Sequence, residues 1–243
     1  QKGIMKLFFG LVFTLILILV LAPLTVLGQI PLLSKLVGAG QKNLGVVVTQ
    51  ADADAALTKV GTEILPLPAS TDPADDYRLE GKREVKLELT ANELTATALN
   101  RPWKNYPVKN VQISIAPDGT IQGSAILIVA KALPYAMAMG YSEAQVREAM
   151  DKFHLPPFEI PVYISGKGNV LNDQVNVNAS NIQIGAVSLP DSLVSQVNQE
   201  AESVLNDLVV KHSDSFHAEK LDFADGKMMF EGYLPEKEYV IQE

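Results

Sequence analysis

The chain contains no cysteine and only three histidines among its 243 residues. Without cysteine, disulfide bonds, thiol catalysis and a lipid-modified N-terminal cysteine are all excluded. Aromatic residues make up only 7% of the chain, whereas hydrophobic residues reach 47%. Any ligand cavity is therefore expected to be lined by Leu, Ile and Val, although a solid packed core is the default for such a composition.

Basic residues are also scarce. The chain has 20 Lys and Arg against 28 Asp and Glu, which gives a formal net charge of −8. A surface that follows a phosphate backbone needs an excess of positive charge. Nucleic acid is therefore not an expected partner.

Sequence motifs of common enzymes are missing. There is no G-x-S-x-G, no P-loop and no H-E-x-x-H, and residues 165–168 lack the spacing of a phosphate-binding loop. The histidines, at positions 154, 212 and 217, are interpreted as ordinary surface residues, although His212 and His217 lie close enough to approach each other across a turn. We expect no enzyme activity and no cofactor.

The acidic loop around Asp72, Asp75 and Asp76 is the remaining candidate for a metal site. Its carboxylates lack the spacing of calcium-binding loops. The favoured interpretation is a solvated acidic loop, with no bound metal.

Residues 7–28 carry no charge. As a helix they would extend about 33 Å, enough to cross a hydrocarbon layer of about 30 Å. One interpretation is a membrane anchor, and the other is a signal peptide cleaved before Gln29. The length of the apolar run favours an anchor that exports the large C-terminal part, so we expect a single-pass protein of the cell membrane with an extracytoplasmic domain.

The remaining chain divides into a linker over residues 29–43, one folded domain over 44–235 and a polar tail over 236–243. The domain is expected to begin with a strand at 44–48. Thr49 and Thr90 each start a T-x-x-[DE] capping box, so helices are predicted from about 50 to 60 and from 91 to 100. The prolines between them predict a loop over residues 62–76.

Alternating apolar residues predict a series of antiparallel strands after residue 108. Hairpins are expected at 111–129 around Pro117-Asp-Gly119, at 158–179 around Asn172-Asp173, and at 216–234 around Asp225-Gly226. Ser142 starts a further capping box, and the apolar stretch at 133–141 is interpreted either as a lip of a pocket or as a buried connector. The predicted fold class is α+β.

A strand at 182–189 ends at Pro190 and is followed by a long helix. Apolar residues recur every three or four positions from Leu193 to Val209, and Asp191 or Ser192 is the expected N-cap. At 1.5 Å per residue this helix is about 27 Å long, enough to lie along a whole sheet.

The chain resembles the bacterial extracytoplasmic YpmS and LmeA-like phospholipid-binding proteins. The resemblance covers residues 44–235 and is carried by Tyr106-Pro-Val-Lys-Asn-Val-Gln-Ile, Ile184-Gly-Ala-Val-Ser-Leu-Pro190 and Leu221-Asp-Phe-Ala-Asp-Gly-Lys-Met-Met-Phe-Glu-Gly232. It implies a tubular fold in which a curved antiparallel sheet wraps around a long amphipathic helix, with an acyl chain in the gap.

On this basis the expected ligand is a lipid or another long apolar molecule. The residues expected to line its site are Val111, Ile113, Val175, Val177, Ile182, Ile184, Leu193, Val197, Val204 and Leu208, with Trp103 and Met137 near the entrance. For Trp103 the alternative is a ring that plugs the edge of the core. For the whole protein the alternative is a structural or accessory subunit that docks on another protein of a cell-envelope complex.

Overall fold

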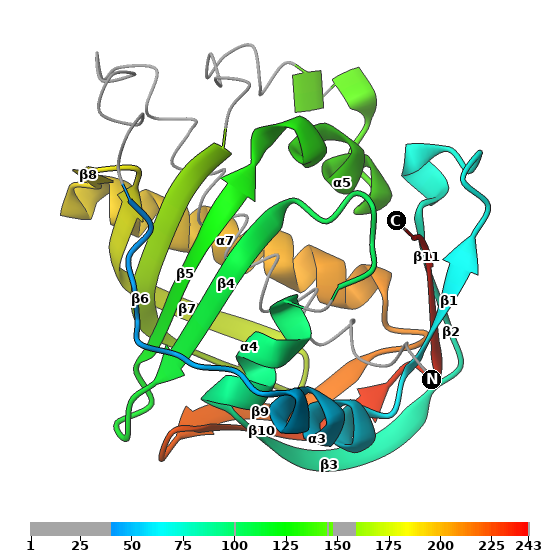
Figure 1. The fold of residues 1–243 in the computed structure, drawn as a ribbon, viewed down its shortest axis with the longest axis horizontal. Coiled ribbons are helices and arrows are strands. Elements are labelled where there is room, and N and C mark those ends of the chain that lie inside the picture. The colour runs from blue at the N-terminus through cyan, green and yellow to red at the C-terminus, as the bar shows by residue number, and fades with distance from the viewer. Residues whose placement is uncertain (1–39, 100, 145, 148–158, 243) are drawn as a thin grey trace.

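The computed structural model describes residues 40–242 except 100, 145 and 148–158. These residues form an α+β structure with an eight-stranded, mostly antiparallel sheet and a separate three-stranded sheet (Figure 1). The predicted fold class is confirmed at this level. The expected membrane anchor at 7–28 lies outside the described residues, and no helix within them is long and apolar enough to span a membrane.

The large sheet follows the order β3-β10-β9-β6-β5-β4, with β7 on the other side of β6 and β8 paired with β7. Its strands are β3 (Arg83–Thr90), β4 (Val108–Ile115), β5 (Ile121–Ile128), β6 (Glu159–Leu171), β7 (Gln174–Ile184), β8 (Val187–Ser188), β9 (His217–Ala224) and β10 (Lys227–Leu234). The three predicted hairpins are confirmed. Asn172, Asp173 and Asp225 adopt positive φ in two of the turns, as tight hairpin turns require.

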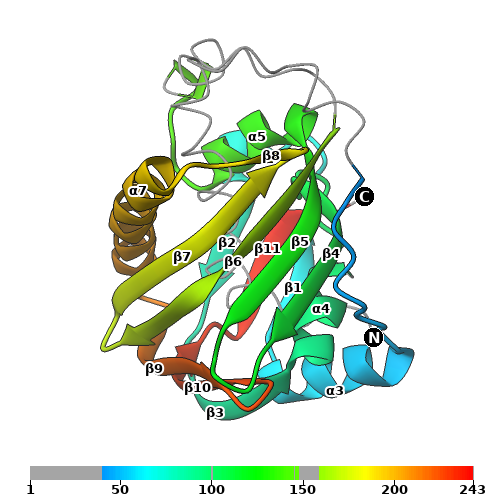
Figure 2. The same ribbon diagram turned by 90° about the vertical axis from the view of Figure 1, so that its left-hand side faces the viewer.

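Helix α7 (Asp191–Lys211) confirms the predicted long helix. It lies beside β7 (Figure 2). Its apolar face, with Val197, Ala201 and Leu205, is buried in the core. The expected cap is wrong, since the N-cap residue is Pro190 and makes no side-chain hydrogen bond. Asp191 instead occupies the first turn, where its negative charge suits the helix dipole.

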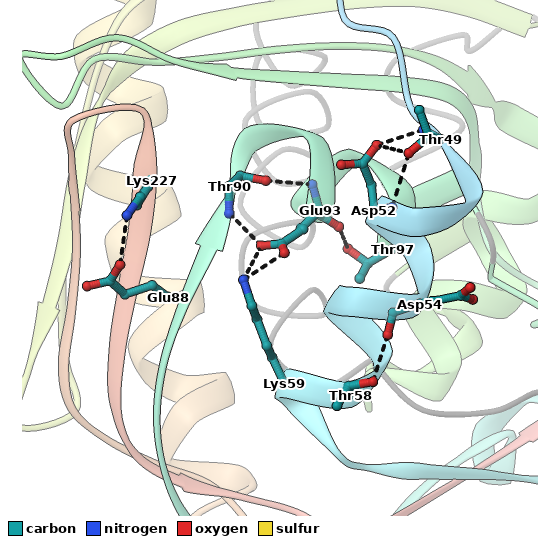
Figure 3. A network of polar contacts seen from close by, with 10 residues as sticks. All are labelled: Thr49, Asp52, Asp54, Thr58, Lys59, Glu88, Thr90, Glu93, Thr97 and Lys227. Carbon is teal, nitrogen blue, oxygen red and sulfur yellow. Dashed lines mark hydrogen bonds and ion pairs between the residues drawn. The ribbon is translucent and has the colours of Figure 1, made fainter.

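Both N-terminal capping boxes are confirmed (Figure 3). Asp52 and Thr49 exchange hydrogen bonds at the start of α3 (Gln50–Val60). Glu93 and Thr90 do the same before α4 (Ala91–Leu99), and Lys59 of α3 donates to the buried Glu93 carboxylate at 2.6 and 2.7 Å. The ion pair therefore joins the two helices. The third box, at Ser142, extends outside the described residues.

The predicted polar tail is wrong. Residues 237–241 form β11 (Lys237–Ile241), the central strand of the small sheet between β1 (Glu63–Leu67) and β2 (Tyr77–Glu80). Val240 and Ile241 are buried. Glu238, which made the segment look solvated, is buried as well and forms an ion pair with Arg101.

Two other predicted segments differ, and a third, for which no element was predicted, forms a helix. Residues 44–48 form no strand, and the predicted loop at 62–76 contains β1. Pro66 is tolerated there because β1 is an edge strand that pairs only with β11 within the described structure. The stretch after residue 131 forms α5 (Ala132–Ala138), which accommodates Pro134 because proline fits the first turn of a helix.

The end of the predicted linker lies on the large sheet rather than away from it. The carbonyl of Lys42 accepts a hydrogen bond from Ser124 Oγ at 2.6 Å, and the Lys42 ammonium lies 3.5 Å from the centre of the Tyr163 ring. Gln41 donates to the carbonyl of Asn110 at 2.6 Å. The chain therefore crosses β4, β5 and β6 before α3 begins.

Candidate functional site

An apolar cavity of about 60 Å³ lies between the large sheet and α7. Side chains from six elements line it, namely Ile113, Ile121, Ile164, Val175, Leu205 and Phe223. These side chains share one environment because each points to the inner side of its strand or helix. The cavity is the only space we assign to the expected apolar ligand within the part of the chain that the structure describes.

The size of this cavity limits what it can hold. Ligand pockets usually begin at about 300 Å³, whereas one water molecule needs about 10–15 Å³ of such space. A cavity of about 60 Å³ accepts a few waters or a short alkyl group. An extended acyl chain would need the surrounding side chains to move.

A break in strand pairing borders the cavity. Along one side of β6, pairing with β5 ends at Gly166 and pairing with β9 begins at Val170, while β7 covers the opposite side throughout. Residues 167–169 thus have no strand partner on this side among the described residues. We call this gap the β6 notch.

The turn between β4 and β5 closes the far side of the β6 notch. The Asp225 amide donates to the Pro117 carbonyl at 3.2 Å, which holds the turn against β9. Gly119 has a φ of +80°, and a Cβ there would lie 2.3 Å from the Phe223 carbonyl oxygen. Only glycine permits this approach. Lys167 crosses the notch and contacts Asp118, with Nζ 2.9 Å from its carbonyl and 3.3 Å from its carboxylate.

A polar groove of about 600 Å³ lies at the β6 notch. Its floor is formed by β6 and β7, one wall by α7, and the other wall by the β4–β5 turn and β9. Amide and carboxylate side chains dominate the lining, including Asn169, Asn176, Asn178, Asn198, Gln199 and Glu202. We call this the amide groove.

The cavity and the amide groove share part of their lining. Residues that contribute to both are Lys167, Gly168, Asn169, Asn176, Val177 and Phe223. These residues surround the β6 notch. An apolar space and a polar surface therefore meet at one place.

Hydrogen bonds from α7 to the outer edge of β7 hold the helical wall of the amide groove in place. The amides of Val175, Val177 and Ala179 donate to the side chains of Asn206, Glu202 and Asn198, at 2.9, 2.9 and 2.8 Å. Four residues along a helix advance about 6.0 Å and two residues along a strand about 6.6 Å, so the two series stay in register.

The predicted lining residues divide into three groups. Ile113, Val175 and Val177 line the cavity. Val111, Ile182, Ile184, Val197 and Leu208 are buried in the surrounding core, and Leu193 and Val204 pack against it partly exposed. Sequence periodicity identified inward-facing positions correctly, but most of them pack against protein.

The expected position of Trp103 near an entrance is wrong. Its side chain is only 2% exposed, stacks on Tyr77 with ring centres 5.4 Å apart, and donates through Nε1 to Asp76 at 2.6 Å. The alternative, a ring that plugs the core, describes it correctly. Met137 is partly buried on α5, and neither residue lines the cavity or the groove.

The sequence predicted that Asp76 lies in a solvated loop, and for this residue the prediction is wrong. Its carboxylate is fully buried and also accepts hydrogen bonds from Asn105 Nδ2 at 2.5 Å and from the Ile241 amide at 2.6 Å. It therefore joins the loop at 72–76 to the last strand of the chain. Its role is structural.

His212 packs beside this cluster, edge-on to Tyr77. Burial lowers the pKa of His212 to about 4, and the neighbouring Lys211 ammonium adds to the effect. Burial also raises the pKa of Tyr77 well above its usual range, and the negative charge of Glu238 adds to it. His217 instead lies 2.5 Å from Asp173 at the β6–β7 turn.

Sequence reasoning missed the amide groove, although a signal was present. Asn176 and Asn178 alternate with buried valines along β7, and Asn198, Glu202 and Asn206 recur every four residues along α7. The spacing of two places the asparagines on one face of the strand, and the spacing of four places the polar residues of the helix on one face of the helix. Only the packing of α7 beside β7 brings the two faces together.

Within the described residues no group of His, Asp and Glu side chains forms a metal site. No protein-family model, curated protein or solved structure matches this chain.

Proposed function

We propose that the domain binds an amphiphile at the β6 notch, with its apolar end in the cavity and its polar part in the amide groove. The observation that carries the proposal is the lining shared by the two spaces. A molecule with one apolar and one polar end satisfies both surfaces at once. A wholly apolar ligand would leave the amide groove unused.

The apolar end of this ligand is short or enters only in part. The cavity of about 60 Å³ suits a terminal alkyl segment, and deeper insertion requires α7 to shift from β7. Such a shift would break the hydrogen bonds of Asn198, Glu202 and Asn206 to the strand edge. In this proposal α7 is the wall of a tubular lipid-binding fold, as the resemblance to the YpmS and LmeA-like proteins implies.

The cellular setting follows from the apolar segment at residues 7–28. We place this segment in the cell membrane and the folded domain on its outer side, in the bacterial cell envelope. The ligand is then a membrane lipid or a related amphiphile that the tethered domain holds or presents. No catalytic step is part of the proposal.

The test uses the full chain in lipid nanodiscs with isotope-labelled Ile, Leu and Val methyl groups. Titration with hexan-1-ol should shift the methyl signals of Ile113, Ile121 and Val175. Val177→Phe fills the cavity and should abolish these shifts, and Val177→Ile, which adds one carbon, should weaken them. If hexanol leaves these signals unchanged, or if Val177→Phe does not alter the response, the cavity is not the site of an apolar ligand.

A second candidate is a structural subunit of an envelope complex. The tightly packed interior favours it, as do the exposed apolar side chains of Val47, Leu171 and Val210, which are 73%, 57% and 70% exposed. A contiguous apolar patch marks a protein contact, and these three exposed residues are the positions from which such a contact is sought. If the protein is a subunit, photo-crosslinking from these three positions in native membranes should capture one dominant partner protein. If it is an amphiphile-binding protein, the three positions should capture no shared partner.

A further inference from the structure

We propose that the amide groove selects an uncharged, polyhydroxylated group, such as the sugar of a glycolipid, and not a phosphate. This inference rests on the proposed function for the position of the apolar end. It adds the chemical class of the polar end. The groove itself, of about 600 Å³, is large enough for one or more sugar rings.

The first argument is the hydrogen-bonding chemistry of the lining. Asn and Gln side chains each offer two N–H donors and a carbonyl acceptor. A sugar hydroxyl both donates and accepts, so an amide can meet it in either role. Asn178 and Gln199 face the groove from β7 and α7, and their side chains have no hydrogen-bond partner among the residues described. Their donors and acceptors are available to a ligand.

The second argument is that neighbouring polar groups are already held in place. Asn198 bonds to both backbone groups of Ala179, Glu202 accepts from the Val177 amide, and Asn176 donates to Asn169 at 3.1 Å. Ordered side chains lose little conformational entropy when a ligand binds. The walls therefore form a rigid frame around Asn178 and Gln199.

The third argument is charge. The groove contains the carboxylates of Asp118, Glu202 and Asp222 and a single ammonium, that of Lys167. Asp118 already pairs with Lys167. Phosphate recognition in proteins relies chiefly on cationic side chains, and a surplus of carboxylates repels an anion. The groove therefore disfavours a phosphate and tolerates a neutral sugar.

The experiment compares hexyl glucoside, hexyl phosphate, glucose and inorganic phosphate on the full chain in lipid nanodiscs. Binding is measured by titration of amide and methyl NMR signals. Hexyl glucoside should bind at least about tenfold more tightly than hexyl phosphate, a difference of about 1.4 kcal/mol. Amide signals of Asn178 and Gln199 should move with both hexyl glucoside and glucose, and with neither phosphate compound.

Groove variants add a second readout. Asn178→Ala and Gln199→Ala should each weaken hexyl glucoside about fivefold, because each removes one or two hydrogen bonds. The matched controls Gln174→Ala on β7 and Gln196→Ala on α7 alter exposed amides that do not line the groove, and should bind like the wild type. Unfolding midpoints within about 2 °C of wild type would show that all four variants fold.

The two proposals fail in different ways. If hexyl phosphate binds as tightly as hexyl glucoside and Lys167→Met abolishes it, the groove selects an anion and the inference is overturned. If the sugar compounds bind but the hexyl chain adds no affinity over glucose, the groove inference stands and the cavity proposal fails. If neither sugar compound binds, the inference about the groove is wrong.

Discussion

Asn198 pairs with Ala179 in the way a neighbouring strand would. Its side-chain Oδ1 accepts from the Ala179 amide at 2.8 Å, and its Nδ2 donates to the Ala179 carbonyl at 3.0 Å. One amide side chain thus satisfies both backbone groups of a residue at a sheet edge. Unpaired edges invite association with other chains, so α7 protects β7 while forming one wall of the amide groove.

Asn198→Ala should destabilise the fold by about 1–3 kcal/mol, since it leaves the amide and carbonyl of Ala179 without their partner. Urea unfolding measures the loss, and hydrogen exchange at the Ala179 amide should become faster. Gln196→Ala, on the exposed side of the same helix, should stay within about 0.5 kcal/mol of wild type. Unchanged exchange at Ala179 would show that the edge does not depend on this side chain.

Asp76→Ala should cost about 3–5 kcal/mol, because the indole of Trp103, the Asn105 amide and the Ile241 backbone amide all lose a buried acceptor. Asp76→Asn retains one carbonyl oxygen and should cost less. Thermal unfolding with Trp103 fluorescence follows both changes. Asp75→Ala, at an exposed neighbouring position, is the matched control; equal effects at both positions would contradict the assigned role.

The Arg101–Glu238 ion pair, at 3.1 Å and almost fully buried, should respond unequally to single and double replacement. Arg101→Met alone should destabilise by about 3–5 kcal/mol, because a carboxylate then stays buried without its cation. Arg101→Met with Glu238→Leu should recover most of this loss. A double-mutant cycle from urea unfolding measures the coupling energy between the two residues. If the destabilisations of the two single variants simply add in the double variant, the residues are not coupled and the prediction is wrong.

His212 should make stability depend on pH in the mildly acidic range. Its pKa falls from an ordinary value of 6.5 to about 4 in the folded protein, because of burial and then Lys211. Between these pH values the unfolded chain binds a proton that the folded chain does not. The contribution of His212 to the free energy of unfolding is therefore fully present above about pH 6.5. It decreases by about 2–3 kcal/mol as the pH falls towards 4.

The measurement is urea unfolding at pH 7.0, 6.0, 5.0 and 4.5. His212→Phe keeps an aromatic ring beside Tyr77 and should flatten the profile over this range. His217→Phe serves as the comparison, since that ring lies in a partly exposed contact with Asp173. An unchanged slope in His212→Phe would assign the pH dependence to other groups.

Local patterns predicted most of the regular elements. The helix that starts after Thr90 is marked by the reciprocal Thr90–Glu93 bonds, and the hairpin turn at Asn172-Asp173 by two residues that tolerate positive φ. Such signals involve residues close in sequence. Segments stabilised from a distance were misjudged. The charge of Glu238 made β11 look like a solvated tail, but Arg101, far away in sequence, compensates that charge and allows the strand to be buried.

The candidate site was predictable only in part. Inward-facing residues such as Ile113 and Val177 follow from alternation along a strand, but alternation does not reveal whether the space beside them is filled. The β6 notch depends on where β6 stops pairing with β5, at Ile121, and where it begins pairing with β9, at Leu221, two positions about a hundred residues apart. No local pattern encodes that separation.

The amino-acid sequence by itself determined the elements and their apolar faces, because hydrophobic periodicity, capping residues and turn residues act over a few positions along the chain. Tertiary structure alone decided which polar residues became partners. By helical period alone, Asn198 and Glu202 lie away from the apolar stripe of the helix, yet the packing of α7 beside β7 turns them towards backbone amides. The same packing joins an apolar cavity to a polar groove, since both arise from contacts between segments far apart in sequence.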